Sequence, residues 1–277
     1  MQTPRHSAGI LATVVGALAA VVLATAVSGA TGSASASAHA VRTGEPWDLV
    51  WITDSTGWGV ARPYARLIRQ GRGVSVRVHD EWQGDLAALT ILQRLKDPSD
   101  PWVRLIRNAE IIVVFGNPVG LWVIKGGDCV TNYDLPRPVG LRVWPKYIAA
   151  MKAIYKRIFE IRSGKPVILR ATTMYVPVIH SAPSSPFFLP TSWDEAGITE
   201  ICTKFFEGFS RAVSKAAAAY HVQVADVYTA FNGATHLEDP VAKGYIQPDG
   251  IHPNDKGRAV VANTLVDLGY ARVKAPR

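Results

Sequence analysis

A serine near one end of this 277-residue chain and an aspartate–histidine pair near the other have the residue types needed for acyl transfer. A serine hydroxyl is a poor nucleophile unless a neighbouring imidazole takes its proton. His252 can serve as that base for Ser55, and Asp249 can hold the imidazole in the required tautomer. The aspartate and the histidine share a turn bounded by Pro248 and Pro253, which favours a close approach of the two side chains. The residues therefore predict a catalytic triad of Ser55, His252 and Asp249.

Acyl transfer also needs hydrogen-bond donors for the oxygen that becomes negative in the transition state. Gly84 lies in a polar loop, and its backbone N–H can approach a substrate because no side chain stands in the way. Asn117 follows an apolar run, and its side-chain amide can supply a further donor. Taken singly, each of these residues would suit a helix cap or a turn. Their occurrence together predicts an oxyanion hole of Ser55, Gly84 and Asn117.

Short apolar segments alternate with amphipathic ones, which predicts an α/β fold with a parallel sheet covered by helices on both faces. The five predicted strands are 48–53, 74–78, 111–115, 167–170 and 222–227. The predicted helices are 57–70, 85–95, 147–162, 198–220 and 255–268. Ligands of such sheets lie beyond the carboxyl ends of the strands, and the candidate residues follow predicted strands. Two long irregular stretches, 117–145 and 175–196, are typical of lids or binding walls.

The candidate residues also occur in the order of the four sequence blocks of the SGNH (GDSL-type) hydrolase superfamily, which the chain resembles. The matching positions are Asp54-Ser55, Gly84, Asn117 and the segment DGIHPNDKG at 249–257. The resemblance implies a three-layer α/β/α sandwich of the flavodoxin-like type, with the triad and oxyanion residues named above. Thr53 stands where the family has glycine, and Pro118 stands where it has aspartate. Gly116 is also one residue closer to Asn117 than in the family, so a diverged subfamily is indicated.

The first forty residues have the composition of a secretory signal peptide. Arg5 is their only formally charged side chain, residues 10–27 are apolar, and small residues lead to Ala38-His39-Ala40. An uncleaved membrane anchor is the alternative, because the apolar run approaches the length of a spanning helix. The small-residue tail favours cleavage, after Ala38 or preferably after Ala40. We therefore predict a signal peptide at 1–40 and a single secreted hydrolase domain at 41–277, without stable membrane insertion.

Cysteine usage and charge restrict the partners that the chain can have. Cys129 and Cys202 are an even count in an exported chain, which predicts one disulfide. Two cysteines are too few for a structural zinc site, and no histidine cluster has ligand spacing, so we expect neither metal nor organic cofactor. The net charge is +8, but the basic residues are scattered, and export argues against nucleic acid as a partner. No feature of the sequence indicates an oligomeric state.

Three tryptophans, Trp58, Trp82 and Trp122, lie on the segments that carry the candidate residues. Core packing is one explanation, because tryptophan is buried on average. The other is an aromatic wall that contacts a sugar ring or an acyl chain of the substrate.

The activity that these residues predict is hydrolysis of a carboxylic ester through an acyl-serine intermediate. Extracellular substrates follow from export: acetylated polysaccharide, small-molecule short-chain esters or lipids. Two alternatives stay open. The same triad can transfer an acyl group to a carbohydrate, or the chain can be a binding module on a hydrolase fold that has lost its activity. The presence of all five site residues argues against the binding module.

Overall fold

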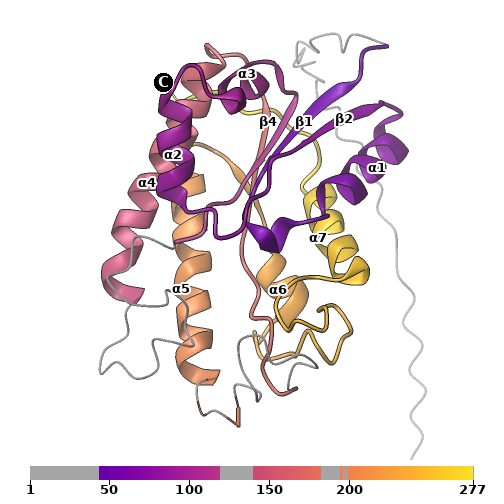
Figure 1. The fold of residues 1–277 in the computed structure, drawn as a ribbon, viewed down its shortest axis with the longest axis vertical. Helices are drawn as coiled ribbons and strands as arrows, with labels where there is room; N and C mark the ends of the chain where they lie inside the picture. Colours follow the sequence, from indigo (N-terminus) through magenta and orange to yellow (C-terminus); the bar gives the residue numbers. More distant parts are fainter. Residues whose placement is uncertain (1–43, 119–139, 182–193, 196, 198, 277) are drawn as a thin grey trace, which may run out of the picture. The chain divides into compact units, whose positions relative to one another are not determined.

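Five parallel strands form one sheet in the order β2-β1-β3-β4-β5 (Figure 1). The structure is a computed structural model and describes residues 44–118, 140–181, 194, 195, 197 and 199–276. The strands are β1 (Trp47–Ile52), β2 (Val76–Asp80), β3 (Ile111–Val114), β4 (Ile168–Thr172) and β5 (Gln223–Ala225). This strand order is that of flavodoxin-like folds. The predicted α/β fold with a five-stranded parallel sheet is therefore confirmed.

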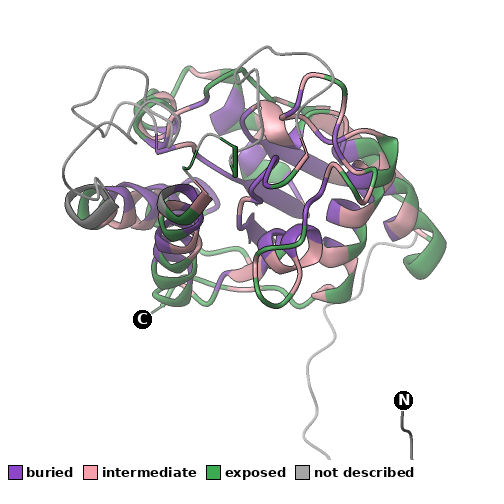
Figure 2. Ribbon diagram, turned by 90° about the horizontal axis from the view of Figure 1, so that it is seen from below, coloured by how far each residue is buried: buried purple, intermediate pink, exposed green. Residues whose placement is uncertain are grey.

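Helices cover both faces of the sheet (Figure 1). One face is covered by α1 (Ala61–Arg72), α6 (Val227–Asn232) and α7 (Asp255–Asp267). The other face is covered by α2 (Ala88–Lys96), α3 (Pro101–Asn108), α4 (Gly140–Ile161) and α5 (Thr199–Ala218). Figure 2 shows buried strands between helices that are exposed mainly on their outer sides. The described residues thus form the predicted three layers.

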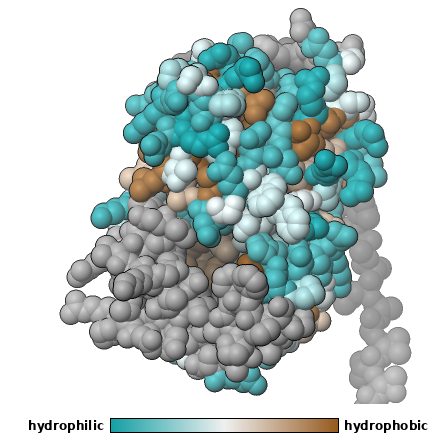
Figure 3. Space-filling view, viewed as in Figure 1, coloured by the Kyte–Doolittle hydropathy of each residue, from teal (hydrophilic) through white to brown (hydrophobic). Residues whose placement is uncertain are grey.

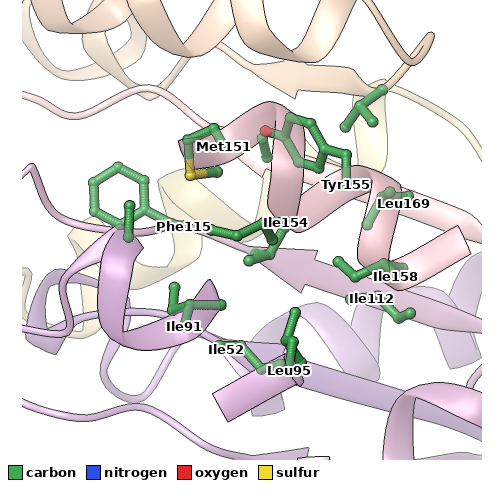
Figure 4. Packing of buried hydrophobic residues seen from close by; sticks show 14 of the residues in the cluster. Ile52, Ile91, Leu95, Ile112, Phe115, Met151, Ile154, Tyr155, Ile158 and Leu169 are labelled. Atoms are coloured by element: carbon green, nitrogen blue, oxygen red, sulfur yellow. The ribbon is translucent and has the colours of Figure 1, made fainter. Parts of the chain in front are cut away.

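The alternation of side chains in β1 shows how one strand supports both layers. Val50 and Ile52 face the helices α2 and α4, whereas Leu49 and Trp51 face α1 and α7. All four side chains are at most 1% exposed. Successive side chains of a strand point to opposite faces, so a strand buried on both faces must be apolar throughout. Figure 4 shows the first of these two cores, in which Ile52 lies among the side chains of α2, β3 and α4.

Two helices were not predicted from the sequence. α3 begins at a capping signal that the sequence contains: the carboxylate of Asp100 accepts from the Trp102 N–H at 2.8 Å, and Pro101 occupies the first helical position. The short α6 follows β5 almost directly, where only a strand was predicted. α4 begins at Gly140, inside the segment predicted to be irregular, and continues through Pro145.

Several predictions fall on residues that the structure does not describe. The predicted signal peptide at 1–40, Trp122 and Cys129 lie outside the described residues. Cys202 lies on α5 with its side chain buried. The signal peptide and the disulfide therefore stay predictions. Within the described ranges, no helix has both the length and the apolar composition needed to cross a bilayer.

Candidate active site

The predicted nucleophile and the predicted oxyanion donors lie on three loops at the carboxyl edge of the sheet. β1 lies between β2 and β3, so the loop that carries Ser55 has the Gly84 loop on one side and Asn117 on the other. From β1 the chain adds β2 on one side, and then adds β3, β4 and β5 on the other side. The direction in which strands are added therefore changes at β1 and β3. Open α/β sheets bind ligands at such a switch point.

Backbone hydrogen bonds join the Gly84 loop to both of its neighbours. The N–H of Gln83 donates to the carbonyl of Thr53 at 3.1 Å, just before Ser55. The N–H of Asn117 donates to the carbonyl of Leu86 at 2.8 Å. The three segments of the predicted oxyanion hole therefore adjoin one another.

The glycine before Asn117 is required by close packing. A Cβ atom at Gly116 would lie 2.7 Å from the Cα of Ala88, nearer than side chains approach a backbone. The Gly116 carbonyl in turn accepts from the hydroxyl of Tyr147 at 2.9 Å. This packing accounts for the position of the glycine, which differs from the family's pattern.

Thr53 stands where the family has glycine, and a glycine four residues later, Gly57, leaves space for its side chain. Its side chain is buried against Gly57, where a Cβ atom would lie 2.2 Å from the Thr53 hydroxyl oxygen. Gly57 is the last residue of the 3₁₀ turn η1 (Ser55–Gly57), which begins at the predicted nucleophile. The threonine therefore fits because the turn leaves it space.

Asp54 organises the turn that carries Ser55. One carboxylate oxygen accepts from the N–H and the hydroxyl of Thr56, at 2.9 and 2.5 Å. The other oxygen accepts from the side-chain amide of Asn117 at 3.0 Å. Burial raises the pKa of Asp54, and the hydrogen bonds from Thr56 and Asn117 offset only part of the rise. Asp54 was not predicted as a site residue, although its place beside Ser55 was a signal.

The Asp249–His252 pair has the geometry of a base and its orienting carboxylate. One oxygen of Asp249 lies 2.7 Å from Nδ1 of His252, and the other accepts from the N–H groups of Ile251 and His252 at 2.9 and 3.0 Å. Partial burial would raise the pKa of Asp249, but these hydrogen bonds outweigh it and the pKa lies below its ordinary value. An ionised carboxylate only accepts, so Nδ1 carries the proton and Nε2 is left as the basic atom.

Trp58 connects this pair to the turn of Ser55. The backbone N–H of Trp58 donates to the carbonyl of Ser55 at 3.1 Å. The Trp58 ring meets the ring of His252 edge-on, with 6.5 Å between the ring centres. From α7, Nε of Arg258 donates to the carbonyl of Trp58 at 3.1 Å, with the guanidinium 4.7 Å from the indole centre. His252 and the turn of the predicted nucleophile are therefore parts of one packed unit.

Tyr175 supports the other side of the Asp249–His252 turn. Its hydroxyl donates to the carbonyl of Ile251 at 2.6 Å, and its ring stacks on Phe231 at 4.3 Å. Burial raises the pKa of Tyr175 well above its usual value, and the charges of Asp54 and Asp249 add to the rise. Tyr175 therefore stays a neutral donor to the turn. Neither Tyr175 nor Arg258 was predicted, although Arg258 directly follows the DGIHPNDKG segment.

Two of the three tryptophans lie on the surface beside the site. Trp58 and Trp82 are 41% and 37% exposed, and their ring centres are 5.7 Å apart. Core packing, the first explanation considered for these side chains, therefore does not apply to this pair. Their exposed rings form one aromatic surface next to His252.

Comparison with known proteins establishes the fold. No protein-family model matches the chain, and no curated protein sequence matches it. A lipase from a goat rumen metagenome is similar in structure, with a TM-score of 0.62 and 18% identity over 81% of this chain and 98% of the lipase. A variant of an acetyl xylan esterase from Geobacillus stearothermophilus gives a TM-score of 0.53 and 15% identity, over 84% of this chain and 98% of the esterase. A lipase/acylhydrolase from Enterococcus faecalis gives a TM-score of 0.50 and 16% identity, over 83% of this chain and 99% of the lipase/acylhydrolase. The chain therefore has the fold of these three structures, which agrees with the α/β/α sandwich that the sequence resemblance implied.

Proposed function

We propose that the chain is a serine hydrolase that cleaves carboxylic esters through an acyl intermediate on Ser55. The observation that carries this proposal is the Asp249–His252 pair, held at 2.7 Å and packed through Trp58 against the turn of Ser55. A charged carboxylate, an oriented imidazole and a serine at a strand end are the parts of an activated nucleophile.

The proposed reaction has two steps. Nε2 of His252 takes the proton of the Ser55 hydroxyl while the oxygen attacks the ester carbonyl, and the imidazolium then returns the proton to the departing alcohol. A water molecule releases the acyl group from Ser55 by the same route, and the serine regains its proton. The N–H groups of Ser55 and Gly84 and the amide of Asn117 stabilise the negative oxygen in both steps.

The substrate that suits this site best is an ester carried by a carbohydrate outside the cell. The paired rings of Trp58 and Trp82 offer an exposed aromatic surface, on which the apolar face of a sugar can stack. One similar structure is that of an acetyl xylan esterase, which agrees with this choice. Secretion, which follows from the predicted signal peptide, is part of the proposal.

The proposal is tested by covalent labelling combined with ester hydrolysis. A fluorophosphonate should add to the peptide that contains Ser55, as detected by mass spectrometry, and should abolish hydrolysis of p-nitrophenyl acetate. Hydrolysis of a p-nitrophenyl ester with a long acyl chain shows whether lipids are also substrates. Labelling without hydrolysis, and with acetyl transfer to an added sugar, would favour the acyltransferase. Hydrolysis that survives complete labelling of Ser55 would overturn the proposal.

Replacing Asn117 by alanine should lower kcat for p-nitrophenyl acetate by about 10²–10³-fold, because one oxyanion donor is lost. The same change removes a hydrogen bond to the buried carboxylate of Asp54, so we also expect a loss of about 1–3 kcal/mol in the free energy of unfolding. Steady-state kinetics and urea unfolding measure the two effects separately. Asn108→Ala, at the exposed end of α3, is the matched control. An unchanged kcat in a destabilised Asn117→Ala variant would make Asn117 a structural residue only.

A further inference from the structure

A groove of about 530 Å³ lies between α1 and the edge strand β2, away from the triad. Its lining is made of basic, small polar and apolar side chains: Arg62, Ala65, Arg66, Arg69, Ser75, Val76 and Val78. From the sequence, these arginines were predicted to be scattered charges on the surface. The fold gathers three of them along one wall.

The three arginines form a row along α1. Positions 62, 66 and 69 recur at helical spacing, so the side chains share one face of the helix over a length of about 10 Å. All three are exposed, and none forms a salt bridge with an acidic residue in the described part of the chain. α1 itself contains no acidic residue. A guanidinium presents a planar fork of donors that matches a carboxylate, so this wall suits a ligand with repeated negative groups.

The floor of the groove is apolar. Val76 and Val78 are half-buried residues of β2 that pack against the core beneath α1, and Ala65 closes the helix side. A charged wall above an apolar floor suits a sugar chain, whose rings combine C–H faces with polar edges. Insertion into a membrane would require exposed large apolar side chains. Those of the described residues are Trp58, Trp82, Leu89 and Leu237, none of which lies on α1 or β2. Much of the flank of the molecule on which α1 lies is hydrophilic in Figure 3.

One end of the groove leads to the candidate active site. Arg62 lies in the first turn of α1, four residues after Trp58, and β2 ends at Asp80, two residues before Trp82. Arg62 and Val78 both line the groove at this end, and the charge of Arg62 partly offsets the rise that burial causes in the pKa of Asp80. A linear ligand in the groove therefore has a path to the paired tryptophans.

We propose that this groove binds an acidic polysaccharide, with sugar carboxylates on Arg62, Arg66 and Arg69. The bound chain extends past Arg62, so that an ester on a neighbouring sugar reaches the Trp58–Trp82 surface and Ser55. The ester part of this inference rests on the proposed function, whereas the binding part does not.

Affinity for polygalacturonate, a linear chain of carboxylated sugars, tests the proposal. The variant R62Q/R66Q/R69Q should bind it at least about tenfold more weakly than the unchanged protein, because three charged contacts are removed. The control K96Q/R104Q/R107Q removes the same charge from exposed positions on α2 and α3, over the opposite face of the sheet, and should bind normally. Circular dichroism and Tm establish that both variants are folded. Isothermal titration calorimetry measures the affinities, with neutral dextran as the second ligand.

Binding is measured in the Ser55→Ala background as well, so that a failure of ester hydrolysis and a failure of the groove are distinguishable. Equal losses in the two triple variants would reduce the effect to net charge and overturn the proposal. Absence of binding to polygalacturonate would also overturn it. Vesicles that contain phosphatidylglycerol form a further arm, and binding to them alone would assign the groove to a membrane surface instead.

Discussion

Replacing Ser55 by alanine should lower kcat for p-nitrophenyl acetate by about 10⁴–10⁶-fold, because no other group in the proposed mechanism can form the acyl intermediate. The folded structure should be retained. Ser55 is a half-buried residue whose carbonyl makes the hydrogen bond to the N–H of Trp58, and alanine keeps that carbonyl. We therefore expect a Tm close to that of the unchanged protein. Steady-state kinetics and differential scanning calorimetry measure the two quantities.

Ser214→Ala is the matched control for this experiment. Ser214 is an exposed residue of α5, so its loss should change neither kcat nor Tm appreciably. If Ser55→Ala and Ser214→Ala retain the same kcat, the nucleophile has been assigned to the wrong residue.

The second large effect is expected for Asp249→Asn, which should reduce kcat by about 10³–10⁴-fold. The single oxygen of the new amide can still accept from the N–H groups of Ile251 and His252, so the turn should keep its shape. The amide nitrogen, however, would face Nδ1 of His252 and donate to it. The imidazole proton would then reside on Nε2, where it blocks removal of the proton from Ser55.

Kinetics and thermal unfolding together distinguish this tautomer effect from a loss of structure. The pKa of Asp249 lies below its ordinary value, so its carboxylate stabilises the folded chain at neutral pH, and the stabilisation disappears as pH falls through the folded-state pKa. The Tm of Asp249→Asn should therefore be slightly lower at neutral pH and approach that of the unchanged protein in acid. Asp267→Asn, at the exposed end of α7, is the control. A full kcat in Asp249→Asn would remove Asp249 from the triad.

The sequence predicted an element best where a short run of consecutive residues determines its structure. β3 could be predicted because both faces of the sheet are covered and every residue of the strand must be apolar. β2 was placed two residues too early. It lies at the edge of the sheet, where His79 and Asp80 can remain in the strand by pairing with Val50 and Trp51. The end of the apolar run therefore did not coincide with the end of the strand.

The same distinction applies to the candidate site. Asp249 and His252 are three residues apart, and their contact is a property of one turn. Tyr175 lies 76 positions from its partner Ile251, and Arg258 lies 200 positions from Trp58. No local pattern encodes such contacts, because they arise only when the sheet has set the separation of the loops.

The bond between Arg258 and Trp58 has a consequence for the order of folding. It joins residues 200 positions apart, and the proposed nucleophile Ser55 and the proposed base His252 are likewise 197 positions apart in the sequence. A chain grows from its amino end, so the turn of Ser55 is synthesised long before α7 exists. Contacts of such long range form late and slowly, because the loop between them must close first. Catalytic competence would thus arise at the end of folding, and the appearance of activity would time the docking of the last helix.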